Sequence, residues 1–373
     1  MNIICGILFS LIMIGILILI PWVGVWAFDL RFLFGVIIPY AAITIFVLGL
    51  IVRVIDWARS PTPFRIPTTA GQEKSLPWIK QNRLDNPSGT LGVIGRMIFE
   101  ILLFRSLFRN LSLEFRQEGP RITYEWEKWL WIAALAFHYS FLLVLLRHLR
   151  FFTEPIPGFV MFLEELDGLF ELGIAPFSGF SVPEILISGF VLLAALAYLF
   201  LRRLYLSQMR FISLPADYFP LFLILGIATT GVMMRYIGAF MQFVFDVDWF
   251  TVEIVNVKEL AVGLVTFHPK IPEDIGTLFF IHLFLVCTLL AYFPFSKLMH
   301  MGGIFLSPTR NLSNNNRFVR HVNPWNYPVK THTYEEYEDE FRDKMIEVGL
   351  PVDKMPEASE EGETESQKET DKE

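Results

Sequence analysis

The sequence contains few cysteines and few charged residues for its length. Only Cys5 and Cys287 occur among 373 residues, which excludes a disulfide framework, a thiolate iron–sulfur site and a CxxCH haem attachment. Charged residues make up 18% of the chain, whereas a typical soluble domain has about 25%. The sequence shows no internal repeat, no Gly-rich phosphate loop and no HExxH or GxSxG signature. The hydrophobic fraction of 53% predicts instead an integral membrane protein whose partner is the lipid bilayer, with no nucleic acid.

Long apolar runs account for this composition. A bilayer core requires about 20 apolar residues per helix. Six segments reach or approach that length: Ile3–Phe28, Phe32–Val52, Trp129–Leu146, Ile185–Leu201, Tyr218–Met234 and Ile275–Phe295. The first segment has neither a charged leading region nor a small-residue cleavage motif, so we do not expect a cleaved signal peptide. The sequence therefore predicts an all-α fold of about six transmembrane helices.

The charges of the loops predict how these spans are oriented. The loop Asp56–Lys128 carries 11 Lys or Arg residues, whereas Phe151–Val182 carries acids and neither Lys nor Arg. Loops rich in Lys and Arg remain on the cytoplasmic side of a membrane. We therefore expect a multi-pass protein of the cell (cytoplasmic) membrane with both termini in the cytoplasm.

The positions of the spans and the charges of the loops divide the chain into four parts. Residues 1–55 form two N-terminal spans, 56–128 a cytoplasmic insertion, 129–301 a helical bundle and 302–373 a cytoplasmic extension. Within the insertion, Leu91–Phe115 is typical of an amphipathic helix in the membrane interface, although it could equally pack under a partner subunit. From Glu335 onward there are 16 acidic and 5 basic residues, and the end of this acidic tail is predicted to be disordered.

Four histidines in or at the ends of two spans are the strongest candidates for chemistry. His138 and His148 are ten residues apart on the third span, and His282 and His300 are eighteen apart on the last. Because these spans run antiparallel, His138 and His300 are expected at similar depths on the cytoplasmic side of the membrane (the proximal pair). His148 and His282 are expected at similar depths on the outer side (the distal pair). Two imidazoles can ligate the iron of one b-type haem, so the pattern predicts a haem-binding helix bundle with two haem b groups.

Two difficulties stand beside this hypothesis. The spacings differ by about 12 Å along ideal straight helices, a mismatch that helix tilt and a kink at Pro294 would have to absorb. A single histidine within a span is also commonly a hydrogen-bonded core residue. Two pairs at compatible depths favour the haem interpretation.

Three arginines fall near the outer face, against the positive-inside trend: Arg147, Arg150 and Arg235. Haem propionates are suitable anionic partners for such cations, so we expect Arg147 and Arg235 to contribute to haem binding. The alternative is that these side chains extend to lipid headgroups.

The histidine spacing resembles that of the gamma subunit of respiratory nitrate reductase, over about Lys128–Met301. In that family the first and last histidines hold the haem near a cytoplasmic iron–sulfur partner, and the middle two hold the haem near the quinol site. The resemblance implies the same roles for the proximal pair and the distal pair.

The two extra N-terminal spans, the insertion and the acidic tail are more similar to the DsrM/HmeC branch, the cytochrome b subunits of a menaquinol complex associated with sulfite and sulfate reduction. This branch implies a cytoplasmic iron–sulfur partner that resembles heterodisulfide reductase (DsrK or HmeD). It also implies further Dsr or Hme subunits, including a multihaem cytochrome c.

The expected function is that of the quinol-oxidising electron-transfer subunit of a membrane oxidoreductase complex, working between menaquinol and the iron–sulfur partner. Quinol oxidation needs proton acceptors beside the distal pair, and Glu154 and Arg150, which directly follow the helix of His148, are candidates. One alternative is a respiratory nitrate reductase gamma subunit. Another is a proton-coupled transporter, which would be expected to show inverted repeats and broken helices in matching halves.

Overall fold

The computed structural model describes residues 3–61, 73–116, 121–168, 184–237, 252–319 and 331–355. The chain separates into two compact units, Met1–Val319 and Arg320–Glu373. The predicted disorder of the acidic tail, from residue 356, lies outside the described residues.

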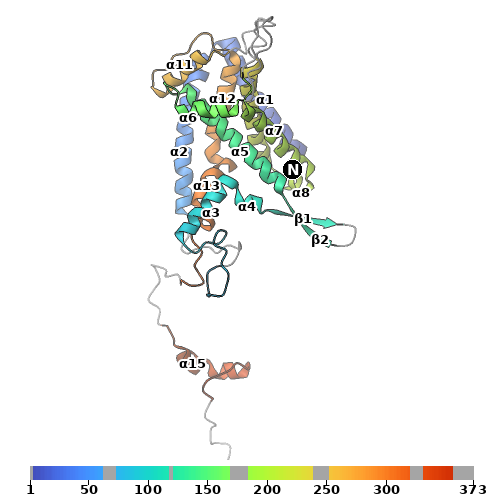
Figure 1. Cartoon of the computed structure of the whole chain (residues 1–373), viewed down its shortest axis with the longest axis vertical. Coiled ribbons are helices and arrows are strands. Elements are labelled where there is room, and N and C mark those ends of the chain that lie inside the picture. Colours follow the sequence, from blue (N-terminus) through green and yellow to red (C-terminus); the bar gives the residue numbers. More distant parts are fainter. Residues whose placement is uncertain are drawn as a thin grey trace, which may run out of the picture. The chain divides into compact units, whose positions relative to one another are not determined.

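Six helices of the first unit are long and apolar enough to cross a membrane. They are α1 (Ile3–Phe28), α2 (Ile38–Arg59, continuous with the π-helical turn η1, Leu33–Ile37), α5 (Lys128–His148), α7 (Ile187–Tyr205), α9 (Pro215–Val232, followed by the π-helical turn η3, Met233–Ile237) and α12 (Thr277–Tyr292). Figure 1 shows them side by side as a bundle. The prediction of an all-α integral membrane fold with six spans is confirmed.

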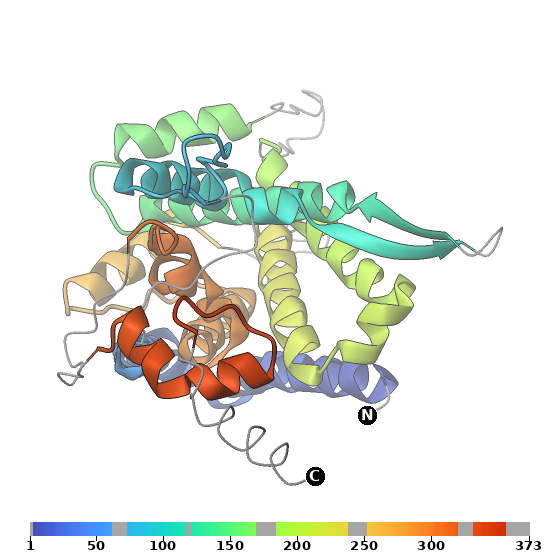
Figure 2. The same ribbon diagram turned by 90° about the horizontal axis from the view of Figure 1, so that it is seen from below.

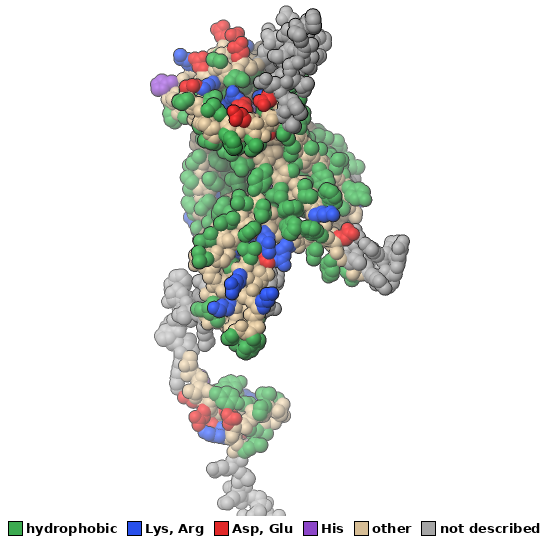
Figure 3. Space-filling model, viewed as in Figure 1, with side chains coloured by type: hydrophobic (Ala, Val, Ile, Leu, Met, Phe, Trp, Pro, Cys, Tyr) green, Lys and Arg blue, Asp and Glu red, His purple; other side chains and the backbone are tan. Residues whose placement is uncertain are grey.

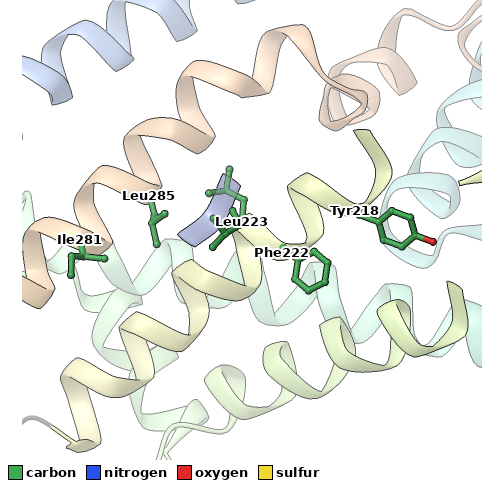
Figure 4. Packing of buried hydrophobic residues seen from close by; sticks show 6 residues of the cluster. Tyr218, Phe222, Leu223, Ile281 and Leu285 are labelled. Carbon is green, nitrogen blue, oxygen red and sulfur yellow. The ribbon is translucent and has the colours of Figure 1, made fainter. Parts of the chain in front are cut away.

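The bundle packs around a small apolar core. Ile14 of α1, Leu223 of α9 and Leu285 of α12 belong to one buried cluster, which is shown in Figure 4. A second cluster joins Leu192 and Leu196 of α7 to α9 and α5. Many other apolar side chains of the spans are exposed, above all on α1 and α2, and contribute to the broad hydrophobic band of Figure 3, as a surface in contact with lipid requires.

The last span is broken where the sequence places Pro294. Helix α12 ends at Tyr292, and two 3₁₀ turns, η5 (Phe293–Phe295) and η6 (Lys297–Met299), lead into α13 (His300–Leu306). Proline cannot donate the backbone hydrogen bond that would continue the helix. The expected kink is therefore present, and the straight-helix spacing of His282 and His300 does not apply.

The insertion differs from the prediction. The amphipathic helix expected over Leu91–Phe115 ends at Leu103 (α3, Thr90–Leu103), because Phe104 adopts a left-handed conformation with φ 48°. A short helix α4 (Arg105–Phe108) follows, and then an antiparallel hairpin of β1 (Leu111–Arg116) and β2 (Arg121–Trp126). The period-2 alternation within this hairpin, which is typical of a strand, was missed.

Shorter elements connect the spans: η2 (Leu149–Phe151), α6 (Gly158–Asp167), α8 (Ser207–Ile212) and α11 (Ile254–Val265). A short helix, α14 (Pro308–Asn311), follows α13 after the last span. In the second unit, α15 (Tyr334–Glu347) begins with a reciprocal cap. The Thr333 hydroxyl accepts from the Glu336 amide, and the Glu336 carboxylate accepts from the Thr333 amide, which satisfies two amides of the helix start.

Candidate haem-binding sites

The structure brings the four span histidines together as two pairs. The ring centroids of His138 and His300 lie 6.0 Å apart with nearly perpendicular planes (86°). Those of His148 and His282 lie 6.5 Å apart with nearly parallel planes (14°). Helix α5 supplies one member of each pair, while α12 and the start of α13 supply the others. The contacts follow the depth pairing expected from the sequence, whereas ligation of haem iron remains a prediction.

A hydrogen bond orients each of the four rings. In His138, His148 and His300 the Nδ1 atom donates to a backbone carbonyl three or four residues earlier, at 2.8, 2.7 and 2.8 Å. A carbonyl oxygen can only accept, so Nδ1 carries the proton in these three rings. The nitrogen that remains for a metal is Nε2, and this division of roles is usual for histidine ligands.

His282 differs because its partner is a side chain of another helix. Its Nδ1 lies 2.9 Å from the hydroxyl oxygen of Thr230 on α9. That hydroxyl lies 2.8 Å from the Gly226 carbonyl and donates to it, so its oxygen accepts the proton of His282 Nδ1. Gly231 leaves room beside the same ring, since a Cβ atom there would lie 3.4 Å from His282 Cε1.

The separations of the rings agree with one iron between each pair. A metal–imidazole nitrogen bond is about 2 Å, so two imidazoles on opposite sides of one metal have centroids about 6 Å apart. The observed 6.0 and 6.5 Å match this requirement. Within the part of the chain that the structure describes, no group of three or more His, Cys, Asp or Glu is placed to hold a metal ion. Each pair consists of two imidazoles, which is the donor set that bis-histidine ligation of a haem uses.

The proximal pair is supported by the insertion. The Phe104 and Phe137 rings each contact the His138 ring edge-on, with centroids 4.9 Å away. Phe104 holds this position because it ends α3 and turns the chain there. Sequence reasoning missed Phe104, since nothing in the local pattern indicates a left-handed phenylalanine beside a histidine of another segment.

Two side-chain hydrogen bonds from α5 bind the C-terminal end of α3. Tyr139 donates its hydroxyl to the Leu102 carbonyl at 2.8 Å, and Trp131 donates its indole N–H to the Leu103 carbonyl at 2.7 Å. The last carbonyls of a helix lack partners within it. These two therefore bind side chains of the span that carries His138.

The structure gives Arg147 and Arg235 protein partners. Arg147 forms a buried ion pair with Asp167, with Nη1 and Oδ2 3.1 Å apart. The same carboxylate accepts from the Ser188 amide at 2.8 Å and the Ser188 hydroxyl at 2.6 Å. Arg235 donates to the Glu184 carbonyl at 3.1 and 3.3 Å. Their role toward haem propionates stays a prediction.

The two candidate residues of the quinol site also have partners. Arg150 pairs with Glu164 of α6, and Glu154 pairs with Lys258 of α11. The Glu154 side chain is 71% exposed, so its carboxylate has access to solvent. The structure thus places both residues just after the helix of His148, in a layer built with α6 and α11.

Comparison with known proteins gives two consistent results. Residues 99–321 match the family of the nitrate reductase gamma subunit. Two relatives are each named Hdr-like menaquinol oxidoreductase cytochrome b-like subunit. The Archaeoglobus fulgidus protein is 44% identical over 300 residues, which cover 79% of this chain and 83% of that protein. The Archaeoglobus profundus protein is 42% identical over 294 residues, covering 77% and 81%. The chain therefore belongs to the nitrate reductase gamma subunit family, among the cytochrome b-like subunits of Hdr-like menaquinol oxidoreductases.

Proposed function

We propose that the chain is a membrane subunit with two b haems, which passes electrons between menaquinol and a cytoplasmic iron–sulfur subunit resembling heterodisulfide reductase. The observation that carries this proposal is the pair of facing histidines at each of two levels on α5. The names of the two relatives support menaquinol as the substrate and an Hdr-like complex as the setting. They favour this function over that of a nitrate reductase gamma subunit.

The residues of the chain would position and insulate the redox groups. When bound, haem supplies reversible one-electron transfer at iron. The Nδ1 hydrogen bonds hold the four imidazoles and leave Nε2 as the nitrogen that would ligate iron in each pair. His138 and His148 are ten residues apart, about 15 Å along α5, so a single helix holds both sites at a fixed separation.

Menaquinol must release two protons when it gives up two electrons. Glu154 is a candidate proton acceptor because its carboxylate is largely exposed and lies beyond the helix of His148, where its ion pair with Lys258 positions it. Arg150 would hold the wall of the site through its ion pair with Glu164. Proton release on this side requires that the distal pair face the outer phase, with both termini in the cytoplasm.

The iron–sulfur subunit would dock on the face that carries His300. The segment after α13 is basic in sequence, and Arg310 of α14 contacts Glu100 of α3 at 3.6 Å. The link to sulfite or sulfate reduction, and the further subunits with a multihaem cytochrome c outside, belong to the same proposal. Crosslinks between the iron–sulfur subunit and α6 instead would contradict both docking and orientation.

Quinol oxidation is tested with the Glu154→Gln variant. We expect slower reduction of the b haems by a menaquinol analogue, with both haems retained in the spectrum, because an amide cannot accept the proton. Glu165→Gln is the matched control, since Glu165 lies on α6 in the same layer and is exposed. Unchanged kinetics in Glu154→Gln, or equal slowing in the control, would remove Glu154 from the site.

A further inference from the structure

The hairpin β1–β2 has one face made of large apolar side chains. The register places Leu111 opposite Trp126, Leu113 opposite Tyr124 and Phe115 opposite Ile122. Directly opposed residues of two strands project from the same face. The described side chains of this face are 46% to 69% exposed: Leu111, Leu113, Ile122, Tyr124 and Trp126.

The alternate register pairs are polar in sequence: Ser112 with Glu125, Glu114 with Thr123 and Arg116 with Arg121. A two-stranded ribbon is marginally stable by itself in water, and a contiguous exposed apolar face needs a cover. The strict apolar–polar alternation indicates that the apolar face of the hairpin is covered and that the polar positions face water.

Contacts at the base of the hairpin show that its apolar face adjoins the helical bundle. Trp126, on the apolar face, packs its ring edge-on against Phe108 with centroids 4.6 Å apart, and its indole N–H donates to the Phe108 carbonyl. The Phe108 ring in turn contacts Trp131 at 4.8 Å. Trp131 lies in the first turn of α5, within a membrane-spanning helix. The apolar face is therefore continuous with the apolar surface of the bundle.

The direction of the hairpin is fixed where it meets the bundle. Glu127, between β2 and α5, accepts from Arg202 at the end of α7 at 2.9 and 3.0 Å. Its backbone amide also donates to the Asn110 carbonyl at 3.2 Å, just before β1. Figures 1 and 2 show the hairpin extending sideways from one end of the bundle.

We infer that the hairpin is an interfacial arm, which lies on the bilayer surface with its apolar face in the boundary between headgroups and acyl chains. Tyrosine and tryptophan are enriched at this level of a membrane, and both occur on the apolar face of the hairpin. The polar face would meet water, and the ion pair of Glu127 with Arg202 would hold the arm parallel to the membrane. The inference does not depend on the haems.

Spin labels on adjacent residues of the two faces test this inference. Leu113→Cys and Ser112→Cys are made in the full chain with Cys5→Ser, where the remaining Cys287 is buried. The protein is reconstituted in vesicles of phosphatidylcholine and phosphatidylglycerol in equal parts. Relaxation by oxygen, which partitions into lipid, is compared with relaxation by a water-soluble nickel chelate.

We expect the label at residue 113 to favour oxygen and the label at residue 112 to favour the nickel chelate. Equal exposure of both labels to the chelate would overturn the inference. Dipolar broadening at residue 113 would assign the apolar face to a second copy of the chain and would also overturn it. So would shielding of residue 113 from both reagents that appears only in the assembled complex, since the cover would then be a partner subunit.

Discussion

Thr230 offers a selective perturbation of one haem site. The Thr230→Val substitution keeps the shape of the side chain and removes the hydroxyl that accepts from His282 Nδ1 at 2.9 Å. Thr230 is 7% exposed, so water does not readily replace the lost acceptor. Hydrogen bonding at Nδ1 makes an imidazole a stronger donor to iron and favours the oxidised state. We therefore expect the midpoint potential of the distal haem to rise.

The expected size follows from the energy of one hydrogen bond. Such a bond contributes about 0.5 to 1.5 kcal/mol net. If the oxidised state loses this amount relative to the reduced state, the potential of a one-electron couple rises by about 20 to 60 mV. The proximal haem should not shift, because His138 and His300 bind backbone carbonyls that the substitution leaves in place.

The assay is a redox titration followed in the haem absorption bands. Thr230→Ser retains a hydroxyl and should restore the original potential. Thr288→Val is the matched control, because the Thr288 hydroxyl on α12 donates to the Phe284 carbonyl of its own helix. An unchanged distal potential in Thr230→Val, or the same shift in Thr288→Val, would refute the reasoning.

Two further predictions concern the ion pairs that hold the sites in place. Asp167→Asn leaves Arg147 buried without its anion, which typically costs about 3 to 5 kcal/mol, so thermal unfolding should begin at lower temperature; an unchanged transition would show that the pair is dispensable. Burial acts to raise the pKa of Asp85, but hydrogen bonds from Arg105 and Asn82 outweigh it and hold that pKa below its usual value. A carboxyl with a lower pKa in the folded state stabilises the fold above its unfolded pKa, and this contribution is lost as pH falls through the folded pKa. Hydrogen exchange should therefore show the segment 73–89 loosening in acid below the ordinary carboxyl range, and Asp85→Asn should loosen it at neutral pH as well; protection that does not vary with pH would contradict this.

The spans and the histidine pairs could be predicted because they depend on local properties of the sequence. Apolar run length identifies a membrane helix, and antiparallel order alone assigns His138 to His300 and His148 to His282. The break near Pro294 was likewise foreseeable, since proline cannot continue the helical ladder.

Other features depend on contacts between distant segments. Asp167 belongs to the acidic loop Phe151–Val182, and nothing in the sequence distinguishes it from the other acids there, whereas the structure buries it against Arg147 and Ser188. The hydroxyl of Thr230 is one of many in the spans, and only the packing of α9 against α12 brings it to His282. The hairpin was hidden because most of its first strand, Leu111–Phe115, was assigned to one helical segment with α3.

The most direct test of the central claim is haem quantitation of the purified chain by the pyridine haemochrome method, with substitutions in each pair. Two facing histidine pairs predict two b haems per chain. His148→Ala and His282→Ala should each lose the distal haem, and His138→Ala should lose the proximal one. A chain that carries no haem, or the loss of the same haem from substitutions in both pairs, would contradict the assignment.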